Sequence, residues 1–133
     1  ICGRYYAMDR DTNWNRTQTT YDLLTGGEMG ILETYKAPTA LEGLKMAYER
    51  DETDEFVLPT LIEAPEKEAG LVRDGDSIVF MNYRPDRARQ ITRAFVDGDK
   101  FEGFDRMLKP ALAAYVCLAE YDESIKAPVA YPS

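Results

Sequence analysis

Three arginines lie within six residues of the stretch MNYRPDRARQ, at positions 84, 87 and 89. A guanidinium can bind a phosphate or a carboxylate through two parallel hydrogen bonds, which a lysine ammonium cannot do. The chain that carries them is acidic overall, with a formal net charge of −8 over 133 residues. An anionic ligand must therefore be held at short range by a few well-placed groups, because the field of the whole protein does not attract it.

Helical spacing separates the arginines of this region into two pairs. Ala88, Ile91 and Phe95 follow one another at the spacing of a buried helical stripe. Arg84 and Arg87 would then share one side at the start of the helix. This spacing predicts a small-anion pocket at these two arginines.

The start of this helix would strengthen such a pocket. Pro85 suits the first helical position, because its missing N–H would be unpaired there in any case. The first turn also offers free backbone N–H groups and the positive end of the helix dipole. Arg89 and Arg93 are expected to face solvent on the opposite side. The alternative is that Arg84 and Arg87 only pair with nearby carboxylates, since the chain has 24 Asp and Glu residues.

Strands that alternate with helices are expected to position these residues. Apolar runs predict strands near residues 55–63, 74–83 and 114–122, of which the last two read as buried on both faces. The alternation indicates an α/β domain with a mixed, largely parallel sheet flanked by helices. In such sheets ligands gather beyond the carboxyl ends of the strands, and Arg84 lies at one of these ends.

Two other helices are predicted in the first half of the chain. The first follows the spacing of Trp14, Thr17, Tyr21 and Leu24 and closes at Gly26 and Gly27. The second begins with a capping box of Thr39 and Glu42 and carries an apolar stripe of Leu41, Leu44 and Tyr48, joined by Ala40 and Ala47. Residues 5–8 are expected to form a short strand or an extended entry segment.

Composition excludes several classes of function. With 44% hydrophobic residues, residues 1–133 fit a single domain with one core. The acidic balance argues against a nucleic acid or an anionic membrane as partner, and no apolar run reaches the ~20 residues of a membrane span. The chain has no histidine, which removes the commonest general base and most zinc sites. Cys2 and Cys117 are expected to be reduced, buried thiols of a cytoplasmic protein.

Four segments resemble one enzyme family, in order and over nearly the whole chain: GRYYAMDRD, DEFVLPTLI, DGDSIVFMNYRPDRARQITRAF and AEYDESIKAPVAYPS. They are similar to the cofactor-independent (2,3-bisphosphoglycerate-independent) phosphoglycerate mutases. The resemblance implies interconversion of 3- and 2-phosphoglycerate in glycolysis and gluconeogenesis. It also implies a phosphatase domain with two Mn²⁺ ions and a serine nucleophile. According to the same resemblance, a phosphotransferase domain that binds the glycerate is inserted into this phosphatase domain.

Residue by residue, the resemblance assigns substrate binding to Arg4, Arg10, Arg84 and Arg87. The chain, which opens on Ile1 rather than Met, is expected to be the latter part of the inserted domain of a longer protein. No catalytic residue and no metal ligand is expected in it, so it should be inactive alone. Its expected partners are the two phosphoglycerates and the phosphatase domain of the same parent chain. The competing expectation is a stand-alone small-anion-binding or interaction module without catalysis.

Overall fold

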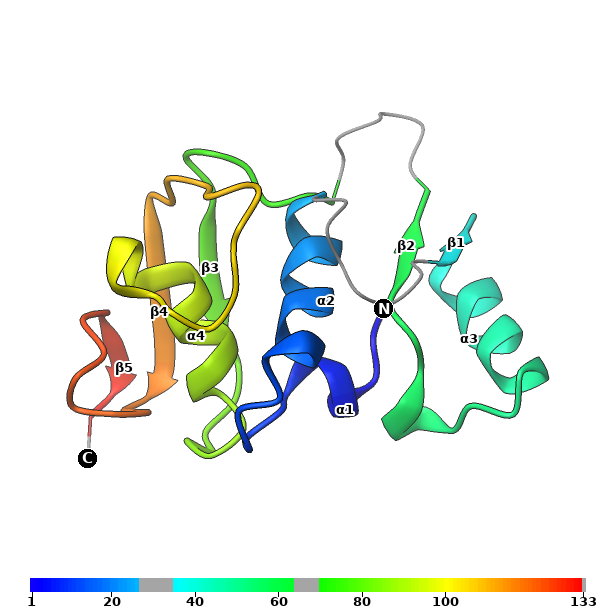
Figure 1. Cartoon of the computed structure of the whole chain (residues 1–133), viewed down its shortest axis with the longest axis horizontal. Helices are drawn as coiled ribbons and strands as arrows, with labels where there is room; N and C mark the ends of the chain where they lie inside the picture. Colours follow the sequence, from blue (N-terminus) through cyan, green and yellow to red (C-terminus); the bar gives the residue numbers. More distant parts are fainter. Residues whose placement is uncertain (27–34, 64–69, 133) are drawn as a thin grey trace.

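The described residues form an α/β fold in which the strands pair in parallel (Figure 1). The computed structural model describes residues 1–26, 35–63 and 70–132. Within these residues a small sheet pairs β1 (Tyr35–Ala37) with β2 (Thr60–Ile62). A larger sheet has the order β3-β4-β5, built from Ser77–Phe80, Ala114–Ala119 and Val129–Tyr131. The expected α/β class with a largely parallel sheet is confirmed.

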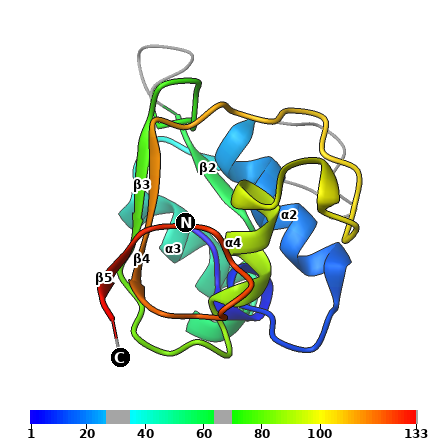
Figure 2. The same ribbon diagram turned by 90° about the vertical axis from the view of Figure 1, so that its left-hand side faces the viewer.

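Four α-helices accompany the two sheets in the described part of the chain: α1 (Arg4–Ala7), α2 (Trp14–Thr25), α3 (Ala40–Glu49) and α4 (Arg89–Val96). Two short 3₁₀ helices follow α3 and α4, namely η1 (Asp54–Phe56) and η2 (Gly98–Lys100). In Figure 1, α2 stands between the small sheet and the large one. Figure 2 shows α2 and α4 on one side of the large sheet, and no described element lies over its other side.

Helix α2 forms where the sequence predicts it and ends at Gly26. This residue has a φ of 83°, a left-handed conformation that favours glycine, and its N–H donates to the Asp22 carbonyl at 2.8 Å. Gly27 lies outside the described residues. The Tyr21 ring packs 4.8 Å from Phe95 of α4, which joins the two helices in the core. The small cluster of Tyr21, Ile91 and Ala94 is thus formed between α2 and α4.

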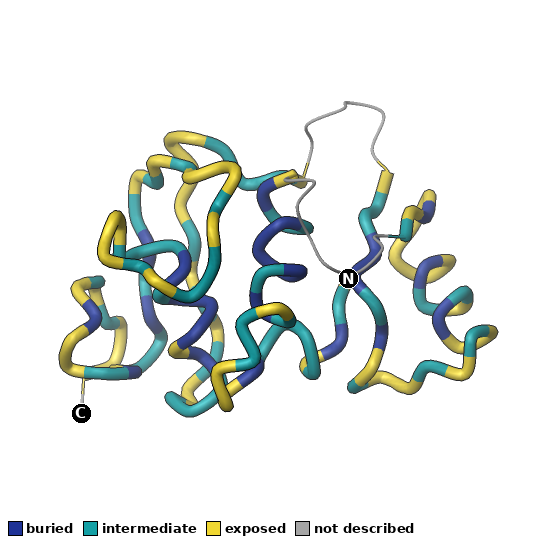
Figure 3. The backbone as a smooth tube through the Cα atoms, in the orientation of Figure 1, coloured by how far each residue is buried: buried dark blue, intermediate teal, exposed yellow. Residues whose placement is uncertain are grey.

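Helix α3 has the predicted cap but buries a different face. The Thr39 hydroxyl accepts from the Glu42 N–H at 3.1 Å, as expected. The predicted apolar stripe is wrong for Leu41 and Tyr48, which are 61% and 49% exposed. Ala47 is buried as predicted, together with Gly43 (Figure 3). Small side chains bring the helix close to the small sheet: a Cβ on Gly43 would lie only 3.2 Å from a methyl of β2.

Strand β3 is not buried on both faces as the sequence predicts. It is the edge of the large sheet, and Val79 is 55% exposed because one face of the sheet has no covering layer (Figure 2). Strand β4 alternates instead, with Tyr115 and Cys117 buried against α4 in the main core cluster. An apolar run therefore formed a strand, but its neighbours decided which face became core.

Residues 5–8 are not extended either, because α1 occupies most of this segment. Its first turn closes when the N–H groups of Tyr6 and Ala7 donate to the Gly3 carbonyl.

None of the described helices is long and apolar enough to cross a membrane. Both cysteines are free thiols, Cys117 buried and Cys2 half-buried.

Candidate anion-binding site

Two loops meet beyond the carboxyl end of β3, at the lower edge of Figure 1. One contains residues 81–88 and leads from β3 into α4, and the other contains residues 8–13 and joins α1 to α2. These are the loops that carry Arg10, Arg84 and Arg87. The position is the one at which open α/β sheets place their ligand-binding residues.

Arg10 and Arg84 converge on the same carboxylate oxygen. The Arg10 Nη1 donates to Asp86 Oδ2 at 3.0 Å, and the Arg84 Nη2 donates to the same oxygen at 3.1 Å. The hydrogen bond from Arg10, together with the charge of Arg84, holds the pKa of Asp86 below its ordinary value. The carboxylate of Asp86 shows the class of group that this pair of guanidinium groups can bind.

Arg87 belongs to the same group by its contact with the other loop. Its Nη1 donates to the Met8 carbonyl at 3.0 Å, just before the residues that lead to Arg10. The structure therefore brings three of the four sequence-predicted arginines to one place. The alternative that these arginines pair with nearby carboxylates holds for Arg84, which bonds to Asp86. Arg87 bonds instead to a backbone carbonyl oxygen.

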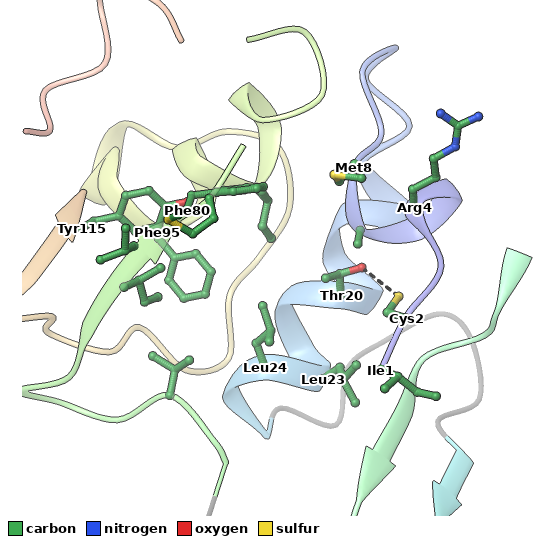
Figure 4. Close-up of a pocket in the computed structure, with 16 residues that line it drawn as sticks. Ile1, Cys2, Arg4, Met8, Thr20, Leu23, Leu24, Phe80, Phe95 and Tyr115 are labelled. Atoms are coloured by element: carbon green, nitrogen blue, oxygen red, sulfur yellow. Dashed lines mark hydrogen bonds between the residues drawn. The ribbon is translucent and has the colours of Figure 1, made fainter. Parts of the chain in front are cut away.

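Arg4 is directed elsewhere. Its Nη2 lies 3.4 Å from the Glu55 carboxylate of η1, and the two side chains are 48% and 38% exposed. Figure 4 shows the Arg4 side chain extending away from the neighbouring apolar pocket. Its backbone is nevertheless only one turn from Met8, whose N–H donates to the Arg4 carbonyl. No contact in the described part of the chain joins Arg4 to the other three arginines.

Helix α4 begins later than the sequence predicts. Its regular part starts at Arg89, and Pro85 opens a separate turn in which its carbonyl accepts from Ala88 N at 3.1 Å. The prediction that Pro85 occupies the first position of the helix is therefore wrong, while the anion site at Arg84 and Arg87 stays a prediction. The predicted buried stripe is confirmed, with Ala88 0% and Ile91 5% exposed.

Arg89 and Arg93 do not simply face solvent. The Arg89 Nε donates to the Tyr121 carbonyl at 2.7 Å, and the Arg93 Nη2 donates to Ser124 Oγ at 2.8 Å. Both thus bind the loop between β4 and β5, whereas Arg87 bonds to Met8 at the end of α1 and Arg84 bonds to Asp86 in its own loop. The predicted separation of the two pairs is confirmed. Arg89 is exposed as predicted, whereas Arg93 is half-buried, so the expected solvation is wrong for Arg93.

A buried hydrogen-bond network beneath the arginines was missed from the sequence. Its centre is the pair Asp9 and Gln90, which are 4% and 6% exposed and joined at 2.8 Å. Burial raises the pKa of Asp9, but hydrogen bonds from Asn13 and Gln90 outweigh it and leave the pKa below its ordinary value. One signal in the sequence could have indicated this network: the polar residue Gln90 lies directly before Ile91, a position of the predicted buried stripe.

The nearby cavity is apolar and does not suit an anion. It has a volume of about 470 Å³ and lies between α2 and β3, with Leu23, Leu24 and Phe80 among its lining residues (Figure 4). The Cys2 Sγ lies 3.5 Å from Thr20 Oγ1 at this cavity, and burial raises the pKa of this thiol. A thiol held in its neutral form is a poor nucleophile.

The described residues offer no set of three His, Cys, Asp or Glu side chains placed to hold a metal ion. What this part of the molecule can do is bind and orient a small anion through arginines.

Comparison with known proteins agrees with the motifs. A family model described as "BPG-independent PGAM N-terminus" matches residues 1–123. The 2,3-bisphosphoglycerate-independent phosphoglycerate mutase of Cellvibrio japonicus is 51% identical over 133 residues, which is 99% of this chain and 25% of the relative. The 2,3-bisphosphoglycerate-independent phosphoglycerate mutase 1 of Methanosarcina barkeri is 53% identical over the same shares of the two chains.

A solved structure shares the fold. The crystal structure of Leishmania mexicana phosphoglycerate mutase at low cobalt concentration superposes with a TM-score of 0.85 and 28% identity, over 98% of this chain and 24% of that one. The chain thus spans about a quarter of the length of its relatives. On the family match over residues 1–123, this chain belongs to the family of 2,3-bisphosphoglycerate-independent phosphoglycerate mutases, as a piece of their N-terminal region.

Proposed function

We propose that this chain is the substrate-gripping part of a phosphoglycerate mutase that interconverts 3- and 2-phosphoglycerate. In this proposal it forms the latter part of the inserted phosphotransferase domain, and the phosphatase domain of the same parent chain supplies the serine that carries the phosphoryl group. The observation that supports this role is the convergence of Arg10 and Arg84 on one carboxylate oxygen, with Arg87 beside them. The parent would act in the cytoplasm.

The proposed role of the arginines is orientation and retention. Phosphoglycerate carries a phosphate and a carboxylate, about three negative charges at neutral pH. Each hydrogen bond to such a charged group is worth roughly 1.5–3 kcal/mol net, so a few arginines can offset the entropy lost by a very small ligand. Retention matters because a glycerate that escapes leaves a phosphoenzyme open to hydrolysis. The favourable field is screened beyond roughly 8 Å, so it acts at contact distance.

Arg4 joins this site in the proposal only after it leaves Glu55. The two side chains form an exposed ion pair at 3.4 Å. Such pairs stabilise a protein by about 0–1 kcal/mol, which is less than the free energy of one charged hydrogen bond to a bound phosphate. An incoming phosphoglycerate would therefore be able to draw Arg4 from η1.

The test is a pair of substitutions in a full-length mutase that contains these 133 residues. Arg87→Ala, which removes a guanidinium from the site, should lower kcat/KM by at least about tenfold, equivalent to about 1.4 kcal/mol of transition-state binding. Arg89→Ala is the matched control, because Arg89 lies two residues away and binds the β4–β5 loop. Circular dichroism should first show that both variants fold. Equal losses in the two variants would contradict the proposed site.

The 133-residue chain alone should show no mutase activity, because in this proposal the bond-making groups lie in the rest of the parent chain. The assay is conversion of 3-phosphoglycerate by the chain purified free of host mutase. Turnover that follows the purified chain through a further column would overturn this assignment of the chemistry to the rest of the parent.

A further inference from the structure

We propose that Asp9 and Gln90 form a buried clamp that positions Arg10 and so sets the affinity of the anion site. This inference rests on the proposed function, since it concerns how the same site is held ready. Neither residue reaches the site itself, so both act through Arg10 as positioning residues. The argument follows the hydrogen bonds from the core outward to the guanidinium.

Asp9 binds the loop that carries Arg10 from the inside. Its Oδ2 accepts from the Asn13 N–H at 2.8 Å and from the Asp11 N–H at 3.3 Å, and its Oδ1 accepts from the Asn13 side chain at 2.9 Å. A carboxylate that accepts this many bonds in a buried place fixes the backbone on both sides of Arg10. Arg16 of α2, 3.4 Å from Oδ1, supplies the neighbouring positive charge.

Gln90 connects this loop to α4. Its Nε2 donates to Asp9 Oδ2 at 2.8 Å and to Thr17 Oγ1 at 3.1 Å, while its Oε1 accepts from the Thr12 N–H at 2.7 Å. One amide side chain thus joins α2, the Arg10 loop and α4. The same helix begins just after Arg87, so the clamp ties the two halves of the arginine group together.

The loop is held in a conformation that it would not adopt freely. Thr12 has a φ of 58°, and the left-handed region is unfavourable for a β-branched residue. Such strain costs of order 1–3 kcal/mol and persists only where the surroundings over-determine the backbone. Here the Gln90 carbonyl oxygen holds the Thr12 N–H. The clamp therefore stabilises a strained loop. On its outer side this loop places the Arg10 guanidinium in contact with Asp86.

Gln90→Glu in the full-length mutase tests the clamp, because it keeps the shape but replaces the amide nitrogen, which donates to Asp9 and Thr17, with an oxygen that carries at most one proton. At low pH the new carboxyl carries a proton and can donate to Asp9 as the amide does. As the pH rises, two carboxylates at hydrogen-bond distance repel each other. The charged side chains next to this pair are Arg16 on α2 and, along the loop, Arg10 and Asp11.

The measurement is KM and kcat for 3-phosphoglycerate from pH 6 to pH 9, in the variant and in the wild type. The ratio of the two KM values should rise with pH by about 10- to 100-fold, the equivalent of one charged hydrogen bond, while the kcat ratio changes far less. A purely structural role would lower the amount of folded enzyme without a pH-dependent KM ratio. A ratio that stays flat over this range overturns the proposal.

Two further variants keep the test decisive. Gln90→Met removes all three hydrogen bonds of the Gln90 side chain without adding a charge, so it should raise KM by a similar factor at every pH. Asn15→Asp adds the same charge at an exposed position of α2 and should leave KM unchanged. If Gln90→Met binds substrate like the wild type, the clamp does not position Arg10.

Arg10→Ala, measured beside them, separates the two proposals. A normal kcat/KM in Arg10→Ala overturns the role of Arg10 in substrate binding, and the clamp with it. A low kcat/KM in Arg10→Ala combined with a flat KM ratio in Gln90→Glu overturns the clamp alone.

Discussion

Asp22 of α2 is a buried carboxylate with one unpaired oxygen in the described part of the chain, and replacing it should stabilise the protein relative to the wild type as the pH rises. The residue is 4% exposed, and its Oδ2 has no hydrogen-bond partner among the described residues. Burial raises its pKa from 3.8 to about 6. The folded state therefore prefers the protonated acid, and the unfolded state does not.

The direction and size of the effect follow from linkage. Because the folded pKa lies above the unfolded one, the contribution of Asp22 to stability is greatest below about pH 4. It is lost as the pH rises to about 6 and stays lost above that. The two pKa values differ by about two units, which corresponds to about 3 kcal/mol at 1.36 kcal/mol per unit.

Asp22→Asn cannot ionise, so its free energy of unfolding relative to the wild type should rise by about 1–3 kcal/mol between pH 4 and pH 7. Urea titrations of the 133-residue chain at several pH values, followed by fluorescence, would give these free energies. The single tryptophan, Trp14, packs 5.4 Å from Phe101 and reports on the core. The pKa values of Asp9 and Asp86 are lowered, so these carboxylates make the free energy of unfolding rise with pH. They do so equally in the variant and the wild type, and their effect cancels when the two free energies are subtracted.

Asp99→Asn provides the matched control, since the Asp99 side chain is fully exposed. Its free energy of unfolding should run parallel to that of the wild type at every pH. The reasoning about Asp22 fails if the free energy of unfolding of Asp22→Asn also runs parallel to that of the wild type, because ionising this buried carboxyl group would then have no energetic cost.

Two backbone predictions concern the same end of the molecule. Gly3→Ala should destabilise the chain by about 1–3 kcal/mol, because a Cβ there would lie 2.6 Å from the Val57 nitrogen and clash with the Glu55 carbonyl, both of which are backbone atoms. An unchanged urea midpoint would show that η1 moves without cost. Thr12→Gly should stabilise it by up to about 1 kcal/mol, because glycine adopts a φ of 58° without strain while the N–H bond to Gln90 remains. A lower midpoint would mean that the threonine side chain contributes more than the strain costs.

The anion site was only partly readable from residue spacing. Helical spacing separated Arg84 and Arg87 from Arg89 and Arg93, and the structure keeps this separation. Spacing had no means to find Arg10, because its partner Asp86 lies 76 residues further along the chain. The motif resemblance supplied Arg10 and Arg4, and contacts then placed Arg10 with the group and Arg4 with Glu55.

Local chemistry in the sequence determined the helices α2 and α3, the Thr39 cap, the left-handed end at Gly26 and the alternation that makes an α/β fold. These depend on residues within a few positions of one another, so propensity and capping decide them. Tertiary structure alone decided which face of α3 and β3 is buried, that Asp9 and Gln90 meet, and that three arginines share one place. Each of these depends on which distant surfaces pack together, and contacts between distant residues leave no periodic trace in a single sequence.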